Sequence, residues 1–95
     1  MRGVYVDLNV TGPNQFTPAL QVEPGQTAAV SAVPVGFAGV VTLQRSLDGV
    51  NFWDVQSWAD SGVQGSYDPE VTQLLRMGVK SGQFSLGAVY LRIEK

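Results

Sequence analysis

Histidine and cysteine, which carry most nucleophilic and metal chemistry, are both absent from this chain of 95 residues. Their absence excludes a Ser-His-Asp triad, a Cys-His pair and the usual zinc, haem and iron–sulfur sites. Acid–base chemistry would depend on carboxylates, lysine or tyrosine alone. We therefore expect a protein that is not an enzyme and that binds no cofactor and no metal ion.

Three acidic side chains, Asp60, Asp68 and Glu70, lie in or beside a polar, glycine-rich segment. A pair of carboxylates can hydrolyse a glycosidic bond when the two groups are about 5–10 Å apart. That reaction takes place in a deep cleft, and a β-domain of this length has little room for one. We expect these three carboxylates to be solvated on a loop.

The segment 39–58 has the strongest local pattern in the sequence. Asp48-Gly49 separates two apolar runs, and this arrangement predicts a β-hairpin. The motif 48–51, together with Asp54, also has some likeness to a calcium loop, but the acidic residue that would complete six to eight oxygen ligands is missing. The hairpin turn is therefore the preferred interpretation. Alternation along the first run places three apolar residues on one face: Val41, Leu43 and Leu47.

The return strand of this hairpin, at 52–58, contains both tryptophans. Residues five apart in a straight strand point to opposite faces, so Trp53 and Trp58 are expected on different sides. We predict that Trp53 packs in the core. Trp58, beside Phe52 on the outward face, is a candidate to fill an interface pocket or to stack on a sugar. Packing beneath the following loop is the alternative for Trp58.

Two arginines, Arg45 and Arg76, each interrupt an otherwise apolar strand. Such an arginine is usually exposed, or paired with a carboxylate while its stem packs flat. An ion pair between subunits is the alternative, because arginine is favoured at such interfaces. Phe16, at the end of the N-terminal segment, joins Arg45, Arg76, Phe52 and Trp58 as the predicted partner-binding residues.

The overall charge argues against nucleic acid and membranes as partners. The formal charge is −2 and the isoelectric point about 4.7, whereas nucleic-acid binders usually carry a basic stripe. No apolar run approaches the ~20 residues that span a bilayer, so we expect a soluble protein made in a cytoplasm. Charged residues make up only 15% of the chain, against about 25% in typical domains. This difference indicates that some surface is buried against a partner or a second copy of the chain.

Short apolar runs separated by glycine and proline predict a single all-β domain over residues 1–95. We expect seven or eight strands in an immunoglobulin-like β-sandwich or a jelly-roll-like barrel, two architectures with the same alternation. One stretch stays open, because 69–77 fits either a helix capped by Asp68 or a strand. The N-terminal segment 1–16 is either the first strand or an arm that reaches a neighbour. The clearest strands are expected at 4–10, 28–33, 41–47, 52–58, 75–79 and 84–94, with a loop at 36–39.

The second half of the chain resembles a recurring pattern in bacteriophage structural proteins. In that family a strand of the form Leu-x-Arg-Ser-x-Asp-Gly precedes a tryptophan, and an aromatic-Arg strand and a terminal Ser-Gly-x-Val-x-Val-Arg-Ile strand follow. Leu75 and Leu86 stand here where an aromatic residue and a serine are common, and neither change alters a β-fold. The motif residues are framework, so the resemblance assigns no binding or catalytic residue. The resemblance covers about residues 25–95, with its motifs at 39–49 (GVVTLQRSLDG), 51–55 (NFWDV), 75–82 (LRMGVKSG) and 87–93 (GAVYLRI).

The resemblance implies a small β-sandwich from a phage particle. On this basis we expect a capsid decoration (cement) protein that binds the assembled major capsid protein on the virion surface, after assembly in the bacterial cytoplasm. A trimer is the expected homo-oligomer, because decoration sites commonly lie on local threefold axes of such shells. Two alternatives stay open: a tail or fibre component, and a carbohydrate- or cell-surface-binding module that uses Trp58, Phe52 and Tyr67 as a stacking platform.

Overall fold

Eight β-strands make up the structure, a computed structural model that describes residues 4–59 and 62–95. The predicted all-β architecture is confirmed, and every strand pair is antiparallel. Neither described range contains a helix, and hence none that could cross a membrane. The strands are β1 (Tyr5–Val10), β2 (Gln15–Phe16), β3 (Leu20–Val22), β4 (Ala28–Ser46), β5 (Trp53–Ala59), β6 (Val63–Tyr67), β7 (Gln73–Val79) and β8 (Phe84–Glu94).

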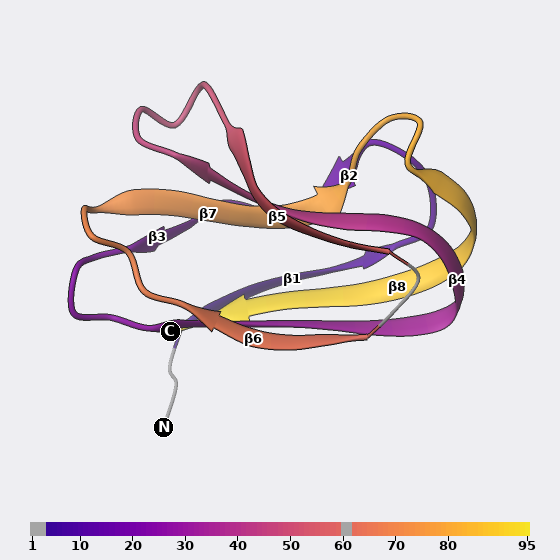
Figure 1. The fold of residues 1–95 in the computed structure, drawn as a ribbon, viewed down its shortest axis with the longest axis horizontal. Coiled ribbons are helices and arrows are strands. Elements are labelled where there is room, and N and C mark those ends of the chain that lie inside the picture. The colour runs from indigo at the N-terminus through magenta and orange to yellow at the C-terminus, as the bar shows by residue number, and fades with distance from the viewer. Residues whose placement is uncertain (1–3, 60–61) are drawn as a thin grey trace.

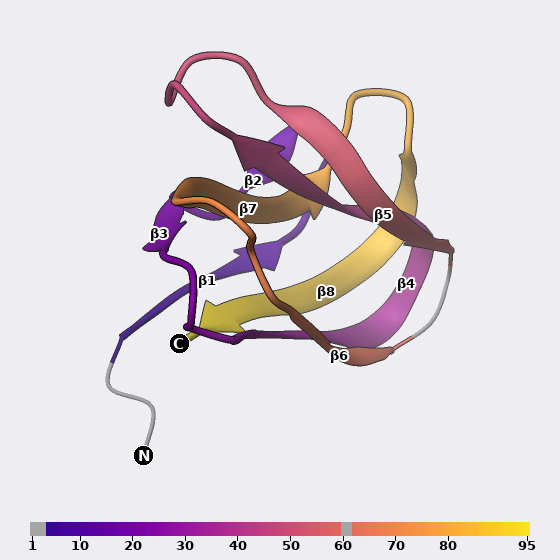
Figure 2. The same ribbon diagram turned by 60° about the vertical axis from the view of Figure 1, so that its left-hand side comes forward.

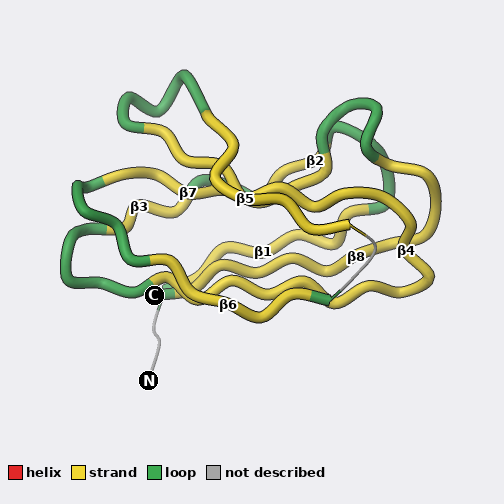
Figure 3. The backbone as a smooth tube through the Cα atoms, viewed as in Figure 1, coloured by secondary structure: helices red, strands yellow, loops and turns green. Residues whose placement is uncertain are grey.

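The strands form two layers that share one long strand (Figures 1 and 3). Sheet I consists of β1, β8, β6 and the first half of β4. Sheet II consists of β7, β5, β2, β3 and the second half of β4. The turned view shows the strands curling around the core toward a nearly closed barrel (Figure 2). The fold therefore combines the two layers of a sandwich with the continuity of a barrel.

β4 crosses from sheet I to sheet II by bending at 36–39, the segment predicted as a loop. Its pairing with β8 shifts register within this bend. Phe37 points back into the core, as predicted, and is 7% exposed. The strand expected at 28–33 does not end there, before Pro34, because β4 continues through this proline. Proline is tolerated there, since the pairing with β6 ends at Ala32 and leaves that edge of β4 free.

The core lies between the two layers and follows the predicted alternation. The outward residues Arg76 and Arg92 stay partly exposed, while their inward neighbours are buried. Leu47, expected to face inward, is 61% exposed, because β4 ends one residue before it. The inward residues of β7 and β8 that are fully buried are Leu75, Met77, Val79, Val89, Leu91 and Ile93.

The segment 69–77, left open between a helix and a strand, contributes to a strand. β7 begins at Gln73 and alternates buried with partly exposed residues up to Met77. This period of two is that of a strand, whereas a helix repeats about every 3.6 residues. Pairing with β4 on one side and with β2 and β3 on the other overrides the capping signal of Asp68.

The N-terminal segment joins the fold as its first strand. β1 pairs with β8 along its whole length, from Tyr5 to Val10. The short strand β2 follows and places Phe16 beside β7. The described part of segment 1–16 therefore lies on this domain and does not extend from it as an arm.

Candidate partner-binding site

The connection between β4 and β5 is the predicted hairpin, and it projects from the body of the domain (Figure 1). The Asp48 carboxylate fixes this turn by accepting four hydrogen bonds. They come from the backbone N–H groups of Val50 and Asn51 (both 2.8 Å), the Asn51 side-chain amide (2.9 Å) and the Ser46 hydroxyl (3.0 Å). These bonds, those of the Asn51 and Val50 backbone first, hold the pKa of Asp48 far below its usual value.

The same contacts favour the turn over a calcium site at Asp48. Both of its carboxylate oxygens already accept hydrogen bonds from N–H or hydroxyl donors. Among the residues that the structure describes, no three acidic, histidine or cysteine side chains gather as metal ligands would. The hairpin-turn interpretation is the one that the geometry supports.

Three large apolar side chains stand exposed on this fixed turn. Leu47 is 61%, Val50 80% and Trp53 54% exposed. Arg45 lies opposite Trp53 on the neighbouring strand and is also exposed. We call Arg45, Leu47, Val50 and Trp53 the hairpin tip.

A β-bulge decides where the two tryptophans lie. The successive residues 43–44 of β4 pair with Gln56 and Asp54, so β5 has one extra residue at this point. The bulge reverses the alternation, and Trp53 and Trp58 therefore face the same side despite their odd spacing. Trp58 packs half-buried against the core, whereas Trp53 lies beyond the end of the core. The predictions of a buried Trp53 and of opposite faces for the two tryptophans are therefore wrong, and of the two alternatives for Trp58 the structure favours packing.

The three aromatic residues considered as a sugar-stacking platform do not form one exposed face. Trp58 and Tyr67 both pack against the core, and the Tyr67 hydroxyl donates to the Gln73 side chain (3.1 Å). The ring of Phe52 lies against Arg76 instead. The geometry gives the carbohydrate-binding interpretation no support.

Arg76 brings together three of the five predicted partner-binding residues on the outer face of sheet II. Its guanidinium carbon lies 4.3 Å from the centre of the Phe16 ring and 3.9 Å from the centre of the Phe52 ring. Phe16 comes from β2 and Phe52 from the hairpin, so three distant parts of the chain meet here. Cation–π contact with both rings holds the guanidinium in place. Arg45 and Trp58 take no part in this contact.

Gly78 makes room for one of these rings. Phe16 lies opposite Gly78 in the register of β2 and β7. A Cβ atom at position 78 would collide with the Phe16 ring and with the carbonyl oxygen of Gln15. Glycine is therefore required for the Phe16 ring to lie across β7, and a glycine inside a strand often marks such a close approach.

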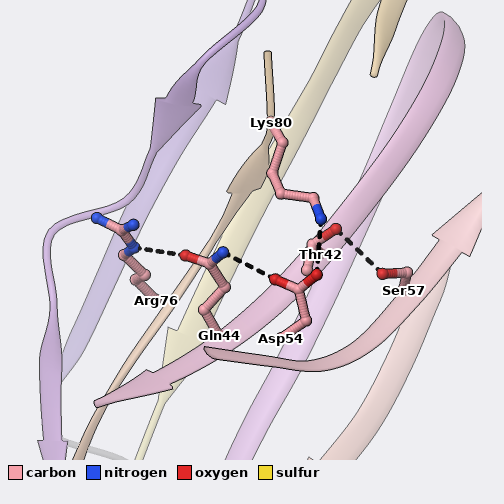
Figure 4. Close-up of polar contacts among 6 residues, drawn as sticks. All are labelled: Thr42, Gln44, Asp54, Ser57, Arg76 and Lys80. Carbon is pink, nitrogen blue, oxygen red and sulfur yellow. Dashed lines mark hydrogen bonds and ion pairs between the residues drawn. The ribbon is translucent and has the colours of Figure 1, made fainter. Parts of the chain in front are cut away.

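A series of polar contacts links Arg76 to the other strands of sheet II (Figure 4). Arg76 Nε donates to Gln44 Oε1 (2.9 Å), and Gln44 Nε2 donates to Asp54 Oδ1 (2.9 Å). Lys80 Nζ binds the second oxygen of Asp54, Oδ2 (2.6 Å). The Lys80 contact, followed by that of Gln44, lowers the pKa of Asp54. We call Phe16, Gln44, Phe52, Asp54, Arg76 and Lys80 the Arg76 cluster.

Among the residues that the structure describes, the guanidinium of Arg76 has no carboxylate partner. Within residues 4–59 and 62–95 the ion pairs are Lys80–Asp54 and Arg92–Glu94. Burial lowers the pKa of Arg76, yet an arginine keeps its proton in proteins. Arg76 is thus neither freely exposed nor paired with a carboxylate of the described residues, whereas the ion pair between subunits stays a prediction. Its guanidinium instead contacts the rings of Phe16 and Phe52 and donates a hydrogen bond to the neutral amide of Gln44.

Several residues of this arrangement, Gln44, Asp54, Lys80 and Gly78, are not among the predicted site residues. A sequence signal is present for Gln44 alone, because polar residues occupy every second position of this strand at 42, 44 and 46. In the structure all three of these polar side chains are buried on the outer side of β4. Thr42 shares a hydrogen bond with Ser57 there (3.1 Å; Figure 4).

The acidic residues considered for catalysis form no site in the described structure. Asp68 and Glu70 are exposed on the connection between β6 and β7, and Asp60 lies outside the described residues. The described surface contains no pocket. No protein-family model, curated protein or solved structure matches this chain.

Proposed function

We propose that this protein is a structural component of a bacteriophage particle, a capsid decoration protein that binds and stabilises the assembled shell of major capsid protein. The observation that carries the proposal is the hairpin tip, where Leu47, Val50 and Trp53 are exposed on a turn fixed by Asp48. This hairpin is built from the residues that carry the phage resemblance in 39–55.

The hairpin tip has the composition and rigidity of an element that docks onto a protein. Tryptophan and arginine are enriched among the residues that dominate binding energy, and Trp53 and Arg45 are neighbours across the hairpin. A turn that is already ordered loses little conformational entropy on binding. These properties support a protein as the partner.

Decoration of a capsid requires that the protein bind the shell, and it requires no catalytic activity. A protein that binds only the assembled shell stabilises it by mass action, by about 2.7 kcal/mol per site at a free concentration of about 100 Kd. The proposal includes a homo-oligomer, a trimer, on the local threefold axes of the shell. A charged fraction of only 15% supports the burial of surface in such contacts.

Quantitative mass spectrometry of purified particles of the source phage tests the proposal directly. We expect a copy number comparable to that of the major capsid protein. A few copies per particle would contradict decoration and favour a tail, portal or fibre component, because those structures hold few copies. Absence from the particle would overturn the virion proposal altogether.

Binding to purified assembled shells tests the role of the hairpin tip. We expect Trp53→Ala to weaken co-sedimentation with shells about 30-fold, the effect of losing ~2 kcal/mol at a binding hot spot. Val35→Ala is the matched control, since Val35 is 68% exposed on sheet I. Equal binding by the two variants would show that the tip is not the docking element.

A further inference from the structure

We infer that the Arg76 cluster is a carboxylate-binding site, which takes the side-chain carboxylate of an aspartate or glutamate on the docked protein. The inference rests on the proposed function, because that function supplies the protein partner. It is carried by the unbalanced charge of the cluster, the free edge of the guanidinium and the position of the cluster beside the hairpin tip.

The charges of the Arg76 cluster do not balance. Arg76 and Lys80 are positive, Asp54 is the one carboxylate of the cluster, and both of its oxygens are already bound. The cluster is thus positive on a protein whose formal net charge is −2. Arg76 is also partly desolvated, and charges interact more strongly where water is displaced. One added carboxylate neutralises the cluster.

The guanidinium of Arg76 is held so that one edge stays free. Phe16 and Phe52 contact it through their rings, and its Nε–H is bound to Gln44. The hydrogen bonds of the described residues give its two Nη groups no acceptor. The parallel N–H groups of an arginine match the two oxygens of a carboxylate. Because the rings and the amide already fix the side chain, binding costs little rotamer entropy.

Gln44 occupies the position beside Arg76 from which an acidic side chain of this chain could neutralise the guanidinium. A glutamate at this position would neutralise Arg76 internally. Glutamine is instead oriented by Asp54, with its nitrogen toward that carboxylate and its oxygen toward Arg76. Gln44 is only 6% exposed, so little water competes for these bonds. The Gln44 amide therefore positions the guanidinium of Arg76 without neutralising its positive charge.

The Arg76 cluster lies next to the hairpin tip in the chain. Phe52 contacts Arg76, and the following residue, Trp53, belongs to the tip. Trp53 and Asp54 point to opposite faces of β5, so a protein reaches both groups only by enclosing the projecting hairpin from both sides. An acidic side chain of a protein fits this site better than a nucleic acid, because a chain with net charge −2 repels a polyphosphate.

Acetate is the simplest probe of this site. At equal ionic strength and pH, we expect sodium acetate but not sodium chloride to shift the NMR resonance of the Arg76 Nε–Hε group in a saturable manner. Arg45 and Arg92 are internal controls, since Arg45 is exposed and Arg92 already contacts Glu94. An Arg76 response no larger than theirs would overturn the inference. A stronger response to inorganic phosphate than to acetate would overturn the carboxylate assignment.

An exchange that conserves net charge tests the same site in shell binding. Gln44→Glu combined with Asp54→Asn moves the carboxylate next to Arg76 and keeps a hydrogen-bonding side chain at position 54. We expect this double variant to lose the acetate response and to bind assembled shells about 10-fold more weakly. Thr42→Val combined with Ser57→Ala is the matched control, because it alters the other polar pair on this face.

Arg76→Lys is the second variant, for the case that the double exchange does not fold. Lysine keeps the positive charge but loses the planar pair of donors, so we again expect weaker binding to shells. If the wild-type protein binds no shells but shows the acetate response, the proposed function fails and the carboxylate site stands. If shells bind the wild-type protein, the double variant and Arg76→Lys equally well, the carboxylate site is wrong and the function stands.

Discussion

Arg76 on sheet II and Arg92 on sheet I contact aromatic rings in a similar way but differ in what balances their charge. The guanidinium carbon of Arg92 lies 3.9 Å from the centre of the Tyr5 ring, as close as that of Arg76 to its nearer ring. Arg92 also reaches Glu94 (3.5 Å). Its hydrogen bond with Tyr90, followed by the charge of Glu94, raises the pKa of Arg92. The pKa of Arg76 is lowered instead, by burial.

The comparison shows that contact with an aromatic ring does not by itself define what an arginine does. Arg92 is neutralised by its own sheet, and its side chain covers the strand surface. Arg76 contacts two rings where Arg92 contacts one, but it forms no ion pair within the part of the chain that the structure describes. Arg76 donates a hydrogen bond to the neutral amide of Gln44, whereas Arg92 on sheet I is paired with the carboxylate of Glu94. Within the described residues, this difference in charge balance distinguishes the two arginines that contact aromatic rings.

Gly78→Ala should lower the free energy of unfolding more than any other substitution considered, through a collision within sheet II. The added Cβ collides with the Phe16 ring and the Gln15 carbonyl, and such overpacking costs about 3 kcal/mol at the upper end of its usual range. Urea denaturation measures the change in the free energy of unfolding. Gly65→Ala on sheet I is the control, because its nearest neighbour is 3.7 Å away. Equal stability of the two variants would contradict the role of Gly78 in placing Phe16.

Gln44→Leu should lower stability by about 2 kcal/mol. It leaves the Nε–H of Arg76 and one oxygen of Asp54 without partners, and unsatisfied polar groups of this kind cost about 1–3 kcal/mol. Thr42→Val with Ser57→Ala removes both partners of a hydrogen bond on the same face, so we expect a change below about 0.5 kcal/mol. Urea midpoints of both variants check this contrast. A larger loss in the Thr42/Ser57 variant would show that the Gln44 link is not the main polar connection of sheet II.

Asp48→Asn should make stability less dependent on acid pH. A carboxylate whose pKa is depressed by folding stabilises the folded state above the unfolded-state pKa, about 3.9 for aspartate. That contribution is lost as the pH falls below this value toward the depressed pKa of the folded state. The wild-type protein should therefore lose thermal stability more steeply than Asp48→Asn between pH values of about 4 and 2.

Thermal midpoints measured across this pH range, together with NMR of the arginine Nε–Hε groups, check the prediction for Asp48. Over this pH range the Arg76 resonance should change less in Asp48→Asn than in the wild-type protein, because Phe52 is carried by the hairpin that Asp48 fixes. Identical pH profiles for the wild-type protein and Asp48→Asn would contradict the assigned role of this carboxylate.

Glu94→Gln should change stability least and sharpen the comparison most. The Arg92–Glu94 contact is a surface ion pair at 3.5 Å, and such pairs add little to stability. The substitution gives Arg92 a neutral neighbour, the situation of Arg76 in the wild-type protein. We expect Arg92 then to acquire an NMR response to acetate. An unchanged Arg92 response would show that the two sites differ by more than the missing carboxylate.

The sequence predicts the fold well because alternation survives in most strands. The inward faces of β7 and β8, the turn at Asp48-Gly49 and the return of Phe37 to the core are all confirmed. Pro34 does not end the strand as predicted, because a proline interrupts a β-strand only where its missing N–H would bond to a neighbouring strand, and the pairing of β4 with β6 ends at Ala32. The bulge in β5 misleads more seriously, because one extra residue exchanges the faces of Trp53 and Trp58. A single sequence contains no periodic signal for such an insertion.

The candidate site is harder to predict, since it depends on long-range register. Arg76, Phe16 and Phe52 are each recognisable as partner-binding candidates. Their convergence depends on the pairing of Phe16 with Gly78 and on the hairpin that carries Phe52, and neither follows from local pattern. That no described carboxylate pairs with Arg76 is likewise a property of the assembled sheet.

The continuity of β4 has a mechanical consequence. The hairpin tip is attached to the end of β4, and this one strand is hydrogen-bonded to β5, β6, β7 and β8. Antiparallel ladder bonds run perpendicular to the strands, so a pull on the tip along β4 loads many of them at once in shear. Force applied at the tip is therefore spread over both layers, and the domain resists extension as one body.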